Sequence, residues 1–229
     1  MMKAALLLLI GLRWMASDTS AYALDPAPAI SKIVKKIQDQ YQATQSLEAD
    51  FIQVNHYEGF TNTFASKGRL YIKRPGKLRW DYLEPIKEQV FVNENKVWVY
   101  VPEHKQVVLS RLAQENDSQL PIHLLSWVAQ LEQEFDIHPE KETASEKELE
   151  TASTLILIPK EGRGGPKKVT LEIDPKTSLI HKITLHEAEG NTATFTFSQI
   201  KTNHDLKDSW FVFTPPNDVE VVQPPPLSR

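Results

Sequence analysis

The sequence predicts a mainly β protein, in which one amphipathic helix precedes an antiparallel meander of short strands that closes toward a barrel or a sandwich. Three observations predict this fold: a helical apolar stripe that begins at residue 30, a change to two-residue alternation from residue 47 onward, and turn-forming residues between most of the alternating runs. Many short strands joined by tight turns are typical of antiparallel barrels and sandwiches. With 229 residues and 41% hydrophobic side chains, the chain can bury the core of one such domain.

The first 23 residues have the pattern of a secretory signal peptide. Lys3 gives a positive start, residues 4–12 are all apolar, and Ala21-Tyr22-Ala23 is a small-x-small cleavage pattern. The apolar run is too short for a membrane span, so we predict export and a cut after Ala23; a buried N-terminal helix or a signal anchor is the alternative. The chain has no cysteine, which excludes disulfides, thiol chemistry and acylation of its own N-terminus.

Residues 24–222 are predicted to form a single domain, followed by a disordered Pro-rich tail at 223–229. After a short leader, Ile30, Ile33, Val34, Ile37 and Tyr41 have the spacing of one helix face. The alternation that follows predicts strands at 47–54, 67–73, 77–82, 88–92, 96–101, 106–109, 154–158, 168–173, 180–186, 193–200 and 210–214.

One segment interrupts the strands with a helical pattern. Residues 121–135 begin with a proline, which suits a first helical turn, and their apolar side chains cover more than half of the helix circumference. A surface helix needs only one apolar stripe. This helix therefore either covers an apolar cavity while packing on the sheet or is simply buried, and the pattern alone does not decide between the two.

Nothing in the sequence has the spacing of a catalytic, metal or cofactor site, so we expect a protein that is not an enzyme. His181 and His186 are five residues apart in a predicted strand and point to opposite faces. The glycines at 162–165 precede a strand-like run, whereas a phosphate-binding loop precedes a helix. The net charge of -4 gives no argument for binding nucleic acid.

The segment Gly68–Tyr82 has the densest pattern of the chain. By parity, Leu70, Ile72 and Arg74 share one strand face, and Leu78 and Trp80 share a face of the next strand. If the first face lines an apolar cavity, Arg74 lies at its rim with an apolar stem and a charged head. There it could latch a covering helix through its carbonyls or side chains. The alternative is an exposed turn arginine.

This segment also carries a family resemblance. The run LYIKRPGKLRWDY resembles the KRP-x-x-x-x-W hairpin of the LolA family, periplasmic carriers of outer-membrane lipoproteins. Three further blocks agree in order: SKIVKKIQDQYQATQSLEADFIQV is similar to the first helix and strand of the family, NENKVWVYVPEHKQV to a later hairpin, and WFVFTPPNDVEVV to the family's ending. The resemblance covers about residues 30–222. The region around 114–135 and the Glu-rich connector after it match only loosely.

The resemblance implies an antiparallel half-open β-barrel of about eleven strands, with helices that form a lid over an apolar cavity. It implies a monomeric periplasmic carrier whose cargo is acylated lipoproteins, received from an inner-membrane Lol ABC transporter and passed to an outer-membrane acceptor that is LolB-like or unknown. It also implies that Arg74 contacts the lid. The alternative function is a periplasmic carrier or sensor of the same fold for another lipid or glycolipid.

From parity and the resemblance together, we expect a lipid-binding cavity lined by strand residues and by the lid. For residues 97–101 both faces are apolar, and we expect the aromatic side chains to point inward. The expected lining residues are Leu70, Ile72, Leu78, Trp80, Phe91, Trp98, Tyr100, Leu125 and Val128. Such a carrier needs a hollow with room for hydrocarbon chains.

Overall fold

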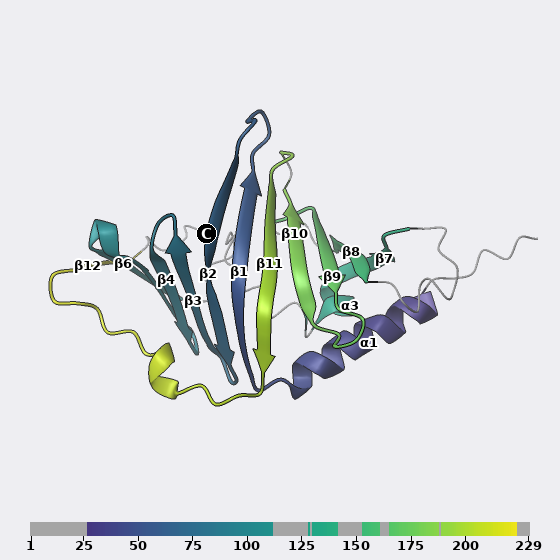
Figure 1. The fold of residues 1–229 in the computed structure, drawn as a ribbon, viewed down its shortest axis with the longest axis horizontal. Helices are drawn as coiled ribbons and strands as arrows, with labels where there is room; N and C mark the ends of the chain where they lie inside the picture. Colours follow the sequence, from purple (N-terminus) through teal and green to yellow (C-terminus); the bar gives the residue numbers. More distant parts are fainter. Residues whose placement is uncertain are drawn as a thin grey trace, which may run out of the picture.

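A single twelve-stranded sheet dominates the protein (Figure 1). A computed structural model describes residues 27–111, 128, 130–141, 153–160, 165–187 and 189–223. The sheet order is β12-β6-β5-β4-β3-β2-β1-β11-β10-β9-β8-β7. Its strands are β1 (Ser46–His56), β2 (Thr63–Lys73), β3 (Lys77–Glu84), β4 (Glu88–Asn93), β5 (Lys96–Val101), β6 (Gln106–Arg111), β7 (Phe135–Pro139), β8 (Thr154–Pro159), β9 (Lys168–Ile173), β10 (Ile180–His186), β11 (Thr192–Thr202) and β12 (Glu220–Val222). All neighbours are antiparallel except β12 and β6, which are parallel.

The prediction of a mainly antiparallel half-open barrel is confirmed, because β12 and β7 form two separate edges of the sheet. Ten of the predicted strand runs correspond to β1–β6 and β8–β11. The run at 210–214 is not a strand: it overlaps the 3-10 turn η3 (Asp208–Phe211) and an extended segment. In that run Phe211 is buried while Trp210 and Val212 are exposed. The alternation arises because this segment lies against the face of the sheet, and not because it is a strand of the sheet.

Irregularities in the strand pairing help the sheet to curve. The register shifts between Glu48 and Asp50 where β1 meets β11, and between Lys67 and Gly68 where β2 meets β3. Such bulges bend the strand that carries them and increase its local twist. On the face that packs against the helix, alternate residues of β1, β2 and β3 such as Ala49, Leu70 and Trp80 belong to the main hydrophobic core. We call this face the concave face and the other the convex face.

Helix α1 (Ala27–Ala43) packs on the concave face as the apolar stripe predicts. Ile30, Ile33, Val34 and Ile37 are buried in the same core as the strand side chains. Figure 1 shows α1 running obliquely past the lower ends of β11, β10 and β9. No helix among the described residues is long and apolar enough to cross a membrane.

The interrupting helix is described only in part. Val128 is helical and buried, and α3 (Leu131–Glu134) contributes the buried Leu131. Residue 135 is not helical as predicted, because Phe135 begins strand β7 and pairs with Pro159 of β8. Leu125, together with the predicted signal peptide at 1–23 and most of the tail at 223–229, lies outside the described residues.

Candidate functional site

A pocket opens between α1 and the concave face of the sheet. Its wall is almost entirely apolar and comes from both ends of the domain: Tyr41, Leu47, Ala49, Leu70, Trp80, Val128, Ile180, Ile183, Phe197 and Ile200. The cavity volume is about 30 Å³, and about 410 Å³ when the open space at its mouth is included. The smaller volume is enough for about two water molecules and too small for an acyl chain. The hollow therefore exists but is nearly closed in this conformation.

The structure brings together part of the predicted lining. Leu70, Trp80 and Val128 line the pocket. Leu78 and Ile72 share the concave face with them and belong to or pack against the same core, but they lie beside the pocket rather than in its wall. Residues of β1, β10 and β11 complete the wall. Parity alone could have identified those of β1, since Leu47 and Ala49 alternate with the polar residues Ser46, Glu48 and Asp50.

Phe91, Trp98 and Tyr100 do not line the pocket, so the expectation that they point inward was wrong. Phe91 pairs with Arg79 and Trp98 pairs with Phe91, which puts all of them on the convex face. The valines that alternate with them, Val90, Val92, Val97 and Val99, occupy the concave positions instead. Both faces of these strands are apolar because each face is covered, one by the core and the other by the segment after β11.

Phe213, in the segment after β11, covers this convex aromatic group. Its ring centroid lies 5.0 Å from that of Phe91, 5.7 Å from that of Trp98 and 5.4 Å from that of Tyr100. Aromatic contacts at these separations add to the free energy gained by burying the rings. Phe213 thus fixes the end of the chain to the outside of β4 and β5.

We expect Phe213→Ser to lower the free energy of unfolding by about 2–3 kcal/mol, because it removes a large apolar side chain from three ring contacts. Urea unfolding followed by circular dichroism measures the change. Val212→Ser is the control, since Val212 is 60% exposed. Equal stability of the two variants would show that the aromatic cover does not hold this segment.

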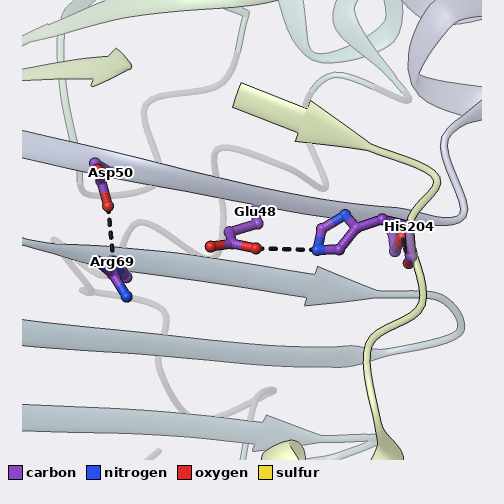
Figure 2. Close-up of polar contacts among 5 residues, drawn as sticks. Glu48, Asp50, Arg69 and His204 are labelled. Carbon is purple, nitrogen blue, oxygen red and sulfur yellow. Dashed lines mark hydrogen bonds and ion pairs between the residues drawn. The ribbon is translucent and has the colours of Figure 1, made fainter. Parts of the chain in front are cut away.

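Polar contacts hold the same segment nearer to β11. Figure 2 shows the Glu48 carboxylate facing the His204 ring, and their Oε2 and Nε2 atoms are 3.0 Å apart. The Asp50–Arg69 contact in the same view joins β1 to β2 within the sheet. Further along, Asp208 lies within 2.8–3.1 Å of the ammonium groups of Lys73 and Lys77. Hydrogen bonds from these two lysines hold the pKa of the Asp208 carboxyl below its usual range. The segment is therefore attached to the convex face along its length.

Arg74 lies in the turn after β2 and contacts the end of helix α1. Its Nη2 donates a hydrogen bond to the backbone carbonyl of Tyr41 at 3.0 Å, while its backbone N–H donates to the carbonyl of Gln45 at 2.9 Å. The Tyr41 carbonyl also accepts the backbone N–H of Thr44 at 3.3 Å. A cation at this position adds a second donor to a carbonyl of the last helical turn and complements the negative end of the helix dipole. The side chain itself is exposed. Among the described residues, its contact with a helix is therefore the one with α1.

Tyr41 links the end of α1 to the pocket wall. Its hydroxyl accepts a hydrogen bond from the backbone N–H of Ile180 at 3.2 Å. Burial raises the pKa of Tyr41 to about 12, so the phenol stays neutral at physiological pH. The sequence placed Tyr41 on the buried helix face without assigning it to a site; its signal was that it is the one residue of that stripe with a polar tip.

The geometry of the pocket suits an apolar ligand. Among the described residues that line the pocket, the Tyr41 phenol is the one ionisable group. Among the residues that the structure describes, no three histidine, aspartate or glutamate side chains lie close enough together to hold a metal ion. The arrangement provides an apolar surface beneath helix α1, whose C-terminal end is held by a few hydrogen bonds.

Comparison with known proteins gives consistent matches over most of the chain. The family "Outer membrane lipoprotein carrier protein LolA" matches residues 42–214. An outer-membrane lipoprotein carrier protein of Dechloromonas aromatica is 31% identical over 205 residues, which cover 90% of this chain and 94% of the relative. One from Methylococcus capsulatus is 31% identical over 181 residues, covering 79% and 83%. The crystal structure of an uncharacterized conserved protein from Thermus thermophilus has the same fold, with a TM-score of 0.54, 15% identity, and coverage of 85% and 98%.

Proposed function

Because the chain belongs to the LolA family of outer membrane lipoprotein carrier proteins, we propose that it carries the acyl chains of lipoproteins through water from the inner to the outer membrane. The observation that carries this proposal is the apolar pocket between α1 and the concave face. The two relatives are described as outer-membrane lipoprotein carrier proteins, and the matches cover 94% and 83% of their lengths.

The physical task explains why a pocket of this kind is useful. Exposing a methylene group to water costs about 0.8 kcal/mol, so one long acyl chain costs on the order of 10 kcal/mol. A carrier does not need to bind with that full free energy, because the chain leaves one apolar environment and enters another. It needs an apolar wall such as that formed by Leu70, Phe197 and Ile200, and a cover that opens reversibly.

The nearly closed pocket implies that binding requires movement of the cover. Helix α1 contributes Ile33, Val34 and Ile37 to the core beneath it, so lifting α1 would uncover apolar wall. Its C-terminal end is held by the hydrogen bonds of Arg74 and Tyr41 to backbone groups. We propose that these contacts set the balance between a closed state and an open, acyl-binding state.

The location and the partners follow from the same proposal. The signal-like residues 1–23 and the description of the relatives support export to the periplasm. A carrier between two membranes needs a donor and an acceptor, for which we propose an inner-membrane Lol ABC transporter and a LolB-like or other outer-membrane acceptor. A carrier does no covalent chemistry, in agreement with the absence of a catalytic motif in the sequence.

Isolation from its own compartment tests the proposed function. The mature protein would be purified from periplasm without detergent, and co-purifying molecules would be identified by mass spectrometry. We expect acylated lipoprotein N-termini. Recovery of glycolipids alone would identify the alternative cargo, and a cargo-free protein that binds no acyl chain in vitro would contradict the carrier proposal.

We expect Ala49→Leu to weaken acyl-chain binding at least roughly tenfold, because Ala49 lines the pocket and the larger side chain fills space needed by the ligand. Equilibrium dialysis with a radiolabelled long-chain monoacylglycerol measures the affinity. Ala65→Leu on β2 is the matched control, since Ala65 is exposed. Equal affinities of the two variants would show that this pocket does not bind the acyl chain.

A further inference from the structure

Two of the described residues that line the pocket carry a hydrogen-bond donor in their side chains. Of the ten described residues that line the pocket, only Tyr41 and Trp80 have side chains that form conventional hydrogen bonds. Trp80 is 2% exposed, and its indole Nε1 is buried without a hydrogen-bond partner among the described residues. A buried N–H that lacks an acceptor destabilises a protein, so a donor kept in this state calls for an explanation.

Tyr41 presents a second unused donor. Its oxygen already accepts the N–H of Ile180, and no hydrogen bond given by its own proton occurs among the described residues. Burial keeps that proton in place, since it raises the pKa of the phenol to about 12. Both polar groups of the wall therefore have a hydrogen to donate.

The surroundings of Trp80 hold its ring in place. Its centroid lies 4.5 Å from that of Phe51, 5.8 Å from that of Phe195 and 6.2 Å from that of Phe197. The nearby Tyr82 hydroxyl donates to Gln53 Oε1 at 2.7 Å. Burial raises the pKa of Tyr82 and the neighbouring Trp80 indole partly offsets that rise, yet the two groups do not meet hydrogen-bond geometry. The indole N–H thus has no acceptor in this conformation, and because its nitrogen is sealed from solvent, an acceptor from outside can reach it only when the pocket opens.

We propose that the Trp80 N–H and the Tyr41 O–H bind carbonyl oxygens of the ester or amide groups through which acyl chains are attached. This inference rests on the proposed carrier function and adds to it a preference for acylated over purely alkyl ligands. A neutral carbonyl supplies acceptors without a donor of its own. A carboxylate fits less well, because none of the described lining residues is a cation and burying an unpaired charge is costly.

The test uses two probes that differ only in the carbonyl: 1-hexadecanoylglycerol, which is an ester, and 1-O-hexadecylglycerol, the corresponding ether. Radiolabelled probes below their micellar concentration would be measured by equilibrium dialysis against the mature full-length protein. We expect the native protein to bind the ester about 3- to 10-fold more tightly than the ether, the effect of one or two neutral hydrogen bonds.

The variants assign the preference to individual donors. In Trp80→Phe the ester-to-ether ratio should fall to about one or two, and in Tyr41→Phe it should fall in part; circular dichroism would check that both fold. Trp98→Phe makes the same change on the convex face and should keep the native ratio. Because the ratio compares two ligands on one variant, a general loss of stability does not imitate the effect.

Each outcome has a distinct meaning. Equal binding of ester and ether by the native protein overturns the carbonyl proposal and leaves the carrier function standing. A preference that survives in Trp80→Phe overturns the role of Trp80. Failure to bind either probe overturns the proposed function together with this inference, so the two failures can be told apart.

Discussion

Arg74→Leu should leave the protein folded but reduce the transfer of lipoproteins to an acceptor membrane to roughly a tenth of its native rate. The guanidinium donates to the carbonyl of Tyr41 in the last turn of α1. A hydrogen bond from a charged group contributes about 1.5 kcal/mol at the lower end of its range, which suits an exposed arginine, and this corresponds to a factor of roughly ten between the closed and open states.

Loss of this contact should favour the open state, and a carrier that stays open retains its cargo. The affinity for acyl chains should therefore rise while release becomes slower. Transfer of a labelled lipoprotein from the purified carrier to outer-membrane vesicles measures the rate, and dialysis measures the affinity. Arg69→Leu is the matched control, because Arg69 lies on β2 and pairs with Asp50 at 2.9 Å, away from α1. A native transfer rate in the Arg74→Leu variant would show that the Arg74 contact does not control release.

Gly68→Val should lower the free energy of unfolding by about 3 kcal/mol or more and the melting temperature by roughly 10 °C. Gly68 lies in β2 where the ring of Phe51 and the backbone of β3 come close together. A Cβ atom at this position would meet the carbonyl oxygen of Asp81 at 2.0 Å and ring atoms of Phe51 at 2.6 Å. Backbone cannot move aside as the end of a flexible side chain can, so the strands must separate.

Thermal unfolding followed by circular dichroism checks this result. Gly59→Asn is the control, since Gly59 has a positive φ of 83° that asparagine tolerates, and a Cβ atom added there would meet no other atom within 4 Å. We expect the control to melt within a few degrees of the native protein. Comparable losses at Gly59 and Gly68 would show that crowding does not explain the glycine in β2.

Local periodicity predicted most of the fold because strands and helices impose their periods on neighbouring residues. The stripe that includes Ile33, Val34 and Ile37 and the alternation of β1–β6 and β8–β11 could be read in this way. Strand β12 could not be predicted in this way, because it has only three residues and they pair with a strand more than a hundred residues earlier in the chain. β7 was missed because its first residue extends the helical pattern before it.

The site was predictable in part for the same reason. Parity grouped Leu70 and Ile72 on one face and Leu78 with Trp80 on the next strand, and the structure places all four on the concave face. Parity cannot say which face of β5 is concave when both faces are apolar. That answer depends on Phe213, which covers the convex face from more than a hundred residues further along the chain.

The segment that leaves β11 has a mechanical consequence for the whole domain. It runs along the outside of β2–β5 through Leu206, Phe211 and Phe213 and ends as β12 beside β6, so it splints one wall of the half-barrel. The opposite wall, β7–β10, has no such splint among the described residues and shares its inner side with α1. We therefore expect the β2–β5 side to stay rigid when cargo enters, and any widening of the half-barrel to occur on the β7–β10 side.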